Sequence, residues 1–178
     1  MKTLAIVGNG RTRVFAPHEN KSIEVWTMNN HAFLWNRRTT AVFEMHPDVL
    51  TAKRYSDEYK EWLRQPHTFP IYMHAPHPDI PSAIRYPREG ISAIFGRHLY
   101  KGVEAVRDFY TSTFPYALAL GLQHGYERIE LYGVDLDKEE RIQHRDCVFF
   151  WLGKASMLGV DIYIPEECEL YQEAVYPL

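Results

Sequence analysis

Thr3-Leu4-Ala5-Ile6-Val7-Gly8-Asn9-Gly10-Arg11-Thr12-Arg13 lies at the start of the chain and indicates its fold class. The uninterrupted apolar run is typical of a parallel strand that is buried on both faces. The glycines after it allow a tight turn and a close approach of the backbone to a ligand. Free backbone N–H groups and positive charges after such a strand form a binding site for phosphate. We therefore predict that Gly8, Asn9, Gly10, Arg11 and Thr12 bind a phosphate-bearing ligand.

The same stretch departs from the fingerprint of dinucleotide-binding proteins. That fingerprint has a third glycine where Arg13 stands, and an acidic residue about 20 positions further on that binds a ribose hydroxyl. Here the second apolar run, residues 22–28, leads instead into Asn29 and Asn30. These differences disfavour NAD and favour a mononucleotide or a nucleotide-sugar.

The bulk composition is that of one globular domain spanning residues 1–178. The net charge of −3 argues against non-specific binding to nucleic acids, which requires many phosphate-neutralising cations. The two cysteines, Cys147 and Cys168, form no disulfide or metal pattern, which is typical of a reducing cytoplasm. We expect neither a signal peptide nor a membrane segment, because no apolar run approaches the ~18 residues of a membrane helix.

Strand and helix patterns alternate along the chain. Apolar runs predict strands over residues 3–8, 22–28, 40–45, 69–73, 128–133 and 160–164, and helical patterns cover 56–63, 103–110, 115–124 and 138–158. This alternation predicts an α/β, Rossmann-like, mostly parallel sheet of about six strands with helices on both faces, in the order 3-2-1-4-5. Segment 65–101 contains six prolines and little periodicity, so we expect an irregular insertion or lid there.

Polar residues at the predicted strand ends are candidate site residues, because ligands of open parallel sheets bind beyond the carboxyl ends of the strands. Asn29 could bind a sugar or base edge through its amide, or could cap a helix that begins near His31. Glu44 and His46 lie two residues apart and would project to the same side of a strand end. A carboxylate beside an imidazole suits general-base catalysis, and a structural hydrogen bond is the alternative.

The two later helices supply further candidates. Ser112 and Thr113 precede a predicted helix, where their hydroxyls would cap its N-terminus and an anion could bind the same N–H groups. His144 lies on the inward face of the last helix, close to the loop that follows the fifth strand. Asp135 or Asp137 in that loop could orient His144 for catalysis.

Metal binding by the protein itself is weakly indicated. His74 and His77 lie three residues apart in a proline-rich loop that has no cysteine nearby. We therefore predict no protein-held metal, whereas Mg²⁺ bound mainly by substrate phosphates would accompany a pyrophosphoryl transfer.

Several of these segments together resemble a Rossmann-like family related to archaeal 6-hydroxymethylpterin pyrophosphokinases and bacterial sialyltransferase-like enzymes. The matching positions are Gly8 to Thr12, Ser112-Thr113, Gly125 to Asp135 and Gly159 to Tyr163. The short chain also resembles small proteins encoded in bacteriophage genomes, for which the compartment would be the host cytoplasm. The resemblance implies a nucleotide or nucleotide-sugar ligand with its phosphates at Gly8, Asn9 and Gly10 and with Asp135 nearby.

We therefore predict a nucleotide- or nucleotide-sugar-dependent transferase that moves a glycosyl or pyrophosphoryl group. Arg11 and Arg13 would offset phosphate charge, and His144 or Glu44 would move the proton. Two alternatives remain: a phage protein that sequesters a nucleotide without turnover, and a nucleoside-monophosphate N-glycosidase. The 12 tyrosines and four tryptophans could form a homo-oligomer surface or a base-stacking pocket.

Overall fold

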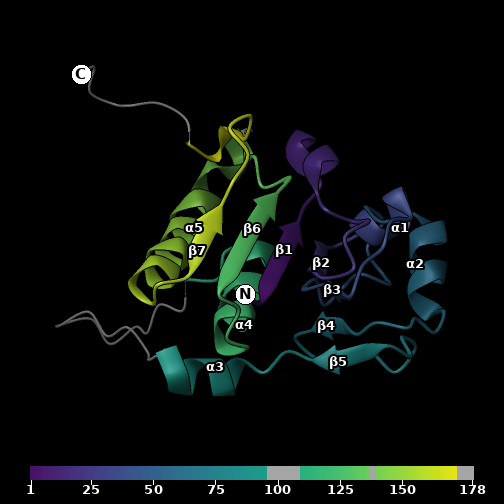
Figure 1. The fold of residues 1–178 in the computed structure, drawn as a ribbon. Helices are drawn as coiled ribbons and strands as arrows, with labels where there is room; N and C mark the ends of the chain where they lie inside the picture. Colours follow the sequence, from purple (N-terminus) through teal and green to yellow (C-terminus); the bar gives the residue numbers. More distant parts are fainter. Residues whose placement is uncertain (96–108, 137–138, 172–178) are drawn as a thin grey trace.

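Seven parallel strands form one open sheet in the order β5-β4-β3-β2-β1-β6-β7 (Figure 1). The structure is a computed structural model that describes residues 1–95, 109–136 and 139–171. The strands are β1 (Thr3–Val7), β2 (Glu24–Met28), β3 (Ala41–Phe43), β4 (Ile71–Met73), β5 (Ala83–Arg85), β6 (Arg128–Tyr132) and β7 (Asp161–Tyr163). The helices are α1 (His31–Trp35), α2 (Asp57–Arg64), α3 (Arg88–Phe95), α4 (Thr113–Gln123) and α5 (Glu139–Met157), with short 3₁₀ turns η1 (Arg11–Phe15) and η2 (Glu169–Tyr171). The predicted Rossmann-like α/β class is confirmed.

The predicted strand order is wrong for the fourth strand. We expected residues 69–73 beside the first strand, but β4 pairs with β3, and β6 occupies the place beside β1. The chain builds β1 to β5 outward in one direction and then returns through α3 and α4 to the other side of β1. The strand order therefore still reverses at β1, which is where open α/β sheets bind their ligands.

The predicted irregular insertion contains regular structure. Within 65–101, β4 and β5 extend the sheet and α3 follows them, whereas residues 96–101 lie outside the described part. The two strands are only three residues long, and the prolines stand at their ends. Proline can stand there because it lacks only the N–H; the Pro70 carbonyl still accepts from the Val42 N–H at 2.9 Å. A lid role for this segment stays a prediction.

Three of the four predicted helices are present in the structure. α2, α4 and α5 confirm the helices expected near 56–63, 115–124 and 138–158, and Gly159 ends α5 with φ +72°. α4 begins at Thr113, so Pro115 lies in its first turn, where proline is tolerated. The helix expected at 103–110 falls mostly outside the described residues.

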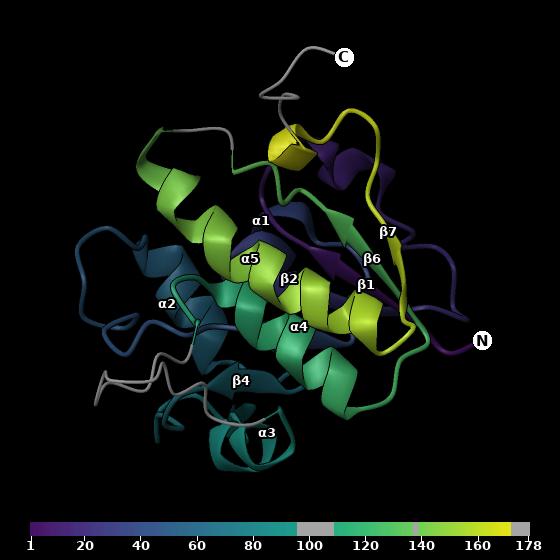
Figure 2. The same ribbon diagram turned by 90° about the vertical axis from the view of Figure 1, so that its left-hand side faces the viewer.

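The helices cover both faces of the sheet, as Figure 2 shows with α4 and α5 in front of the strands. Leu4, Ile6, Trp26 and Phe43 pack with α4 and α5, while the alternate residues of the strands face α1, α2 and η1. α4 is apolar nearly all round because it lies between the sheet and its neighbouring helices. α4 connects two parallel strands and therefore runs antiparallel to them. Its N-terminus for this reason lies at the carboxyl edge of the sheet.

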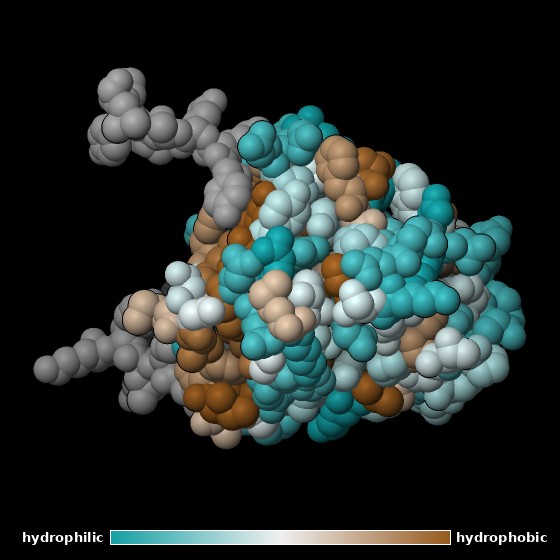
Figure 3. Space-filling view, in the orientation of Figure 1, coloured by the Kyte–Doolittle hydropathy of each residue, from teal (hydrophilic) through white to brown (hydrophobic). Residues whose placement is uncertain are grey.

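The surface shows where apolar side chains remain exposed. In Figure 3 they gather on the left-hand side, where α3 and α5 lie. The exposed large apolar side chains of these two helices are Ile94, Phe149 and Met157. The predicted homo-oligomer stays a prediction. Within the described ranges, no helix has both the length and the apolar character needed to cross a bilayer.

The two glycines after β1 lie tightly against the end of β6. The Gly8 N–H donates to the Tyr132 carbonyl at 2.8 Å, and the Gly10 N–H donates to the Gly133 carbonyl at 2.9 Å. A Cβ atom on Gly10 would lie 1.9 Å from the Asp135 Oδ2 atom and 2.9 Å from the Gly133 carbonyl oxygen. Glycine is therefore required at position 10 by packing within the protein.

We predict that Gly10→Ala lowers the free energy of unfolding by about 2 kcal/mol, the usual cost of forcing an atom into a packed site. Gly153→Ala is the matched control, because a Cβ there meets no atom within 4 Å and the residue lies inside α5. That control should be neutral or stabilise by up to about 1 kcal/mol. Urea unfolding of both variants measures the difference, and equal stabilities would contradict the packing argument.

Candidate functional site

A cavity of about 380 Å³ lies at the carboxyl ends of β1, β2, β3 and β6. It is bounded by these strand ends, by the N-terminus of α4 and by the beginning of α5. Its lining consists of Asn9, Gly10, Met28, Asn29, His46, Thr111, Ser112, Thr113, Phe114, Gly133, Asp135, Leu136 and His144. Seven of the predicted site residues are thus brought to one place: Asn9, Gly10, Asn29, Ser112, Thr113, Asp135 and His144.

The glycine loop does not form the free anion cradle that the sequence predicts. Because the N–H groups of Gly8 and Gly10 both donate to carbonyls of the β6 end, neither is free to bind phosphate. Gly8 is also covered by the Phe114 ring, which a Cβ atom would meet at 2.4 Å. The close approach that the glycines permit is between two segments of the protein, and Gly10 borders the cavity beside it.

Thr12 and Asp135 join η1 to the loop after β6. The Thr12 hydroxyl donates to the Asp135 carboxylate at 3.2 Å and accepts from the Gly133 N–H at 2.8 Å. Both side chains are buried, at 1% and 2% exposure, so each polar group needs this partner. Asp135 therefore lines the cavity, whereas Thr12 lies behind the cavity wall and holds Asp135 in place through this hydrogen bond.

Arg11 and Arg13 point away from the cavity. Arg11 forms an ion pair with Glu169 and is not among the lining residues. The Arg13 guanidinium donates to the carbonyls of Asn9 and Gly10, each at 2.8 Å, and stacks over the Trp35 ring at 4.0 Å. Arg13 therefore stabilises the shape of the loop, and the expected neutralisation of phosphate by these two arginines has no support in this arrangement.

Three asparagines at the ends of β1 and β2 make side-chain hydrogen bonds. The Asn9 amide donates to the Asn30 Oδ1 atom at 2.9 Å, and its own Oδ1 lies 3.2 Å from the His31 Nδ1 atom. Asn29 adopts φ +53°, which asparagine tolerates, and its Oδ1 accepts from the Thr113 hydroxyl at 3.2 Å. The capping position of α1 belongs to Asn30, so Asn29 remains a cavity residue.

Two buried polar atoms on the cavity wall have no hydrogen-bond partner among the described residues. Ser112 occupies the N-cap of α4, but its side chain makes no capping hydrogen bond, contrary to the sequence-based expectation. Its Oγ atom and the Nδ1 atom of His144 are both buried without a partner. Buried polar atoms are normally hydrogen-bonded, so these two indicate where a ligand would supply the missing partners.

The end of β3 carries a hydrogen-bonded carboxylate–imidazole pair. Glu44 is fully buried, and its Oε1 atom lies 2.6 Å from the His46 Nδ1 atom. Its other oxygen accepts from the Tyr59 hydroxyl at 2.7 Å. Burial, followed by the nearby Glu44 charge, raises the pKa of Tyr59 well above its usual value, so Tyr59 stays a neutral donor. Glu44 itself lies behind the wall, and His46 is the member of the pair that lines the cavity.

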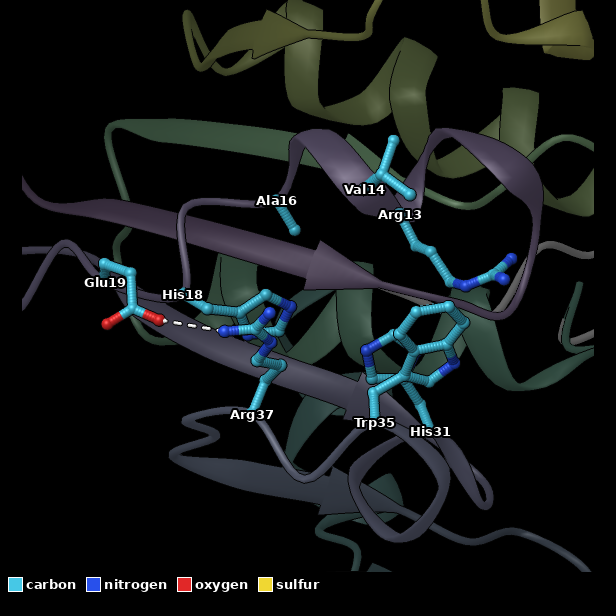
Figure 4. A pocket seen from close by; sticks show the side chains of 8 residues that line it. All are labelled: Arg13, Val14, Ala16, His18, Glu19, His31, Trp35 and Arg37. Carbon is cyan, nitrogen blue, oxygen red and sulfur yellow. Dashed lines mark hydrogen bonds and ion pairs between the residues drawn. The ribbon is translucent and has the colours of Figure 1, made fainter.

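A second cavity, of about 280 Å³, lies on the opposite side of the β1 loop, between η1 and α1 (Figure 4). The His31 ring stacks between His18 and Trp35, at centroid distances of 5.8 and 6.3 Å. Burial, with the charge of His18 and of Arg13, lowers the pKa of His31 to about 4. His31 is therefore neutral near pH 7, which suits its contact with the Asn9 amide.

The sequence missed several residues that complete the site. The sequence predicts His46 only as the partner of Glu44, although the two-residue spacing at a strand end indicates that both side chains project to the same side. The buried partners Tyr59 and His31 come from helices whose packing on the strand ends has no local signature in the sequence. Asp137 lies outside the described residues. Among those described, no group of three or more His, Cys, Asp or Glu side chains gathers that could hold a metal.

No protein-family model and no curated protein sequence matches this chain. Its fold is similar to that of the sialyltransferase CstII from Campylobacter jejuni in complex with the substrate analogue cytidine-5′-monophosphate (CMP). That match has a TM-score of 0.56 and 17% identity, and covers 92% of this chain and 79% of the other. A structure of the sialyltransferase CST-II with a trisaccharide acceptor and CMP matches with a TM-score of 0.51 and 15% identity, over 92% and 80% of the two chains. The likeness shows the Rossmann-like fold.

We predict that Ser112→Ala leaves the free energy of unfolding within about 0.5 kcal/mol of the wild type, because the Ser112 side chain makes no capping hydrogen bond. An ordinary N-cap serine would instead cost about 1 kcal/mol of stability when replaced by alanine. Urea unfolding of the variant and the wild type measures the difference. A loss of about 1 kcal/mol would make Ser112 a structural cap.

Proposed function

We propose that this protein is a nucleotide-sugar-dependent glycosyltransferase whose donor binds in the 380 Å³ cavity. The observation that carries the proposal is the pair of buried atoms without a hydrogen-bond partner, Ser112 Oγ and His144 Nδ1, on two residues that line one cavity. The fold of CMP-bound sialyltransferases supports a cytidine nucleotide as the first donor to test. Asn9 and Asn29 would bind polar edges of the donor through their amides.

The phosphate of the donor would lie at the N-terminus of α4. This helix has 11 residues, and its axis points at the cavity through Ser112 and Thr113. The positive end of a helix dipole favours an anion, and the unused Ser112 hydroxyl would donate to a phosphate oxygen. The proposed anion site is thus at the N-terminus of α4 and not at the glycine loop, where the sequence predicts it.

The reaction would be a direct displacement at the anomeric carbon of the sugar. The acceptor oxygen forms a bond to that carbon, the bond from the carbon to the phosphate oxygen breaks, and the nucleotide leaves with the electron pair. His144 would take the proton of the acceptor hydroxyl as general base, since an imidazole suits proton transfer near neutral pH. Among the described residues Asp135 makes no hydrogen bond to His144, so a role of Asp135 in orienting it stays a proposal.

A panel of nucleotides and nucleotide-sugars tests the proposed activity. The protein is incubated with ATP, with CMP, and with CMP-, UDP- and GDP-linked sugars and a lactose acceptor, with and without Mg²⁺, and the products are separated by mass. A new glycoside or a released nucleotide supports the glycosyltransferase. A free base indicates an N-glycosidase, a transferred pyrophosphoryl group indicates a kinase-type transferase, and an intact bound ligand indicates a sequestering protein.

We predict that His144→Ala lowers turnover of the active donor by 10²- to 10⁴-fold, the usual contribution of a general base, while the dissociation constant for the free nucleotide changes less than about threefold. Asp146→Asn is the control, because Asp146 is an exposed residue on the same helix outside the cavity lining. Steady-state kinetics and calorimetry give the two quantities. Unchanged turnover in His144→Ala would remove His144 from the mechanism.

A further inference from the structure

The end of β3 contributes a charged group to the cavity that the proposed reaction does not use. The described titratable side chains of the lining are His46, Asp135 and His144. The Asp135 carboxylate is bonded to Thr12 and would repel an anion. His46 differs from His144 because a fully buried carboxylate lies directly behind it.

The fully buried carboxyl group of Glu44 has two side-chain hydrogen-bond partners, and one of them can carry a positive charge. A carboxylate that is removed from water is costly unless it is both hydrogen-bonded and paired. Tyr59 supplies a neutral hydrogen bond at 2.7 Å, and the His46 ring at 2.6 Å is the group that can supply the charge. With Nδ1 facing Glu44, the Nε2–H of a charged His46 lies on the other edge of the ring and makes no hydrogen bond to a described residue.

The position of His46 separates it from the proposed general base. Neighbouring strands lie about 4.8 Å apart, so the ends of β3 and β6 are separated by roughly 14 Å across β2 and β1. His46 follows β3, and His144 reaches the cavity beyond β6. The two imidazoles would therefore contact different parts of an extended donor.

We propose that His46, held by Glu44, is an anion-recognition residue that binds an oxyanion of the donor at the β3 end of the cavity. This inference rests on the proposed function. The oxyanion is either the donor phosphate or a sugar carboxylate, both of which accept a charge-assisted hydrogen bond from imidazolium. Glu44 acts through His46 and is a positioning residue. The other ionisable groups around His46 are Tyr55, Asp48 and His74, and none of them lines this cavity.

Binding measurements with three probes test the proposal and distinguish the two oxyanions. CMP carries the phosphate, and cytidine lacks it. CMP-3FNeuAc, a substrate analogue in which a fluorinated sialic acid is linked to CMP, carries both the phosphate and a sugar carboxylate. Dissociation constants are measured by calorimetry at pH 6.5 for the wild type, His46→Gln and Glu44→Gln. His74→Gln is the control, because His74 is another histidine that directly follows a strand, β4, but lies outside the cavity lining.

The proposal expects His46→Gln and Glu44→Gln to weaken CMP or CMP-3FNeuAc binding by 10- to 100-fold, the usual range for a hydrogen bond to a charged group. Cytidine binding and the His74→Gln control should change less than about threefold. A loss for CMP identifies the phosphate, and a loss for CMP-3FNeuAc alone identifies the carboxylate. Glu44→Gln removes the charge but keeps the shape, so its effect separates charge from packing.

Three results would overturn the proposal. Unchanged affinities for both charged probes in His46→Gln would show that the imidazole binds no oxyanion. An equal loss for cytidine would show that His46 has only a structural role. Because His46 is at the surface, its variant stays informative even if Glu44→Gln unfolds. Failure of the wild type to bind either charged probe would overturn the cytidine-nucleotide function as well, which distinguishes the two failures.

Discussion

The contact between the loop after β1 and the loop after β6 is the constraint on which the rest of the site depends. The Thr12 hydroxyl is bonded on one side to the Asp135 carboxylate and on the other to the Gly133 N–H. Only a residue without a side chain at position 10 lets these segments meet, because Asp135 occupies the place of its Cβ. The two strands at which the sheet order reverses are thereby locked together, and their loops form the floor of the cavity.

The charges around this floor explain why a helix and a histidine, rather than arginines, would bind an anion. The N–H groups of the glycines are used within the protein, and the arginines of η1 bind backbone carbonyls and Glu169. What faces the cavity instead is the positive end of α4, with the unused hydroxyl of Ser112. At the β3 end, Glu44 is buried behind His46, which lines the cavity. The proposed binding thus depends on elements that only the complete sheet brings together.

The sequence predicts the fold class well, and it predicts part of the lining of the candidate cavity. Apolar runs bounded by turns predicted β1, β2 and β6, because each of those strands has five residues, of which the last four are buried. β4 and β5 are three residues long and flanked by prolines, so their pattern could not be told from a loop. The rule that ligands bind at strand ends predicted Asn9 and Asn29, and the helix patterns predicted Ser112 and His144, all of which line the candidate cavity. The sequence could not show that the glycines serve packing, or that Tyr59 supports Glu44, because both depend on contacts between segments far apart in the sequence.

The most direct test of the account is a crystal structure of the protein soaked with CMP-3FNeuAc. The account predicts that the ligand lies in the cavity at the ends of β1, β2 and β6, with its phosphate within hydrogen-bond distance of the Ser112 Oγ atom and its sugar beside His144. A ligand bound instead in the cavity beside Trp35, or a cavity left empty at saturating ligand, would contradict it.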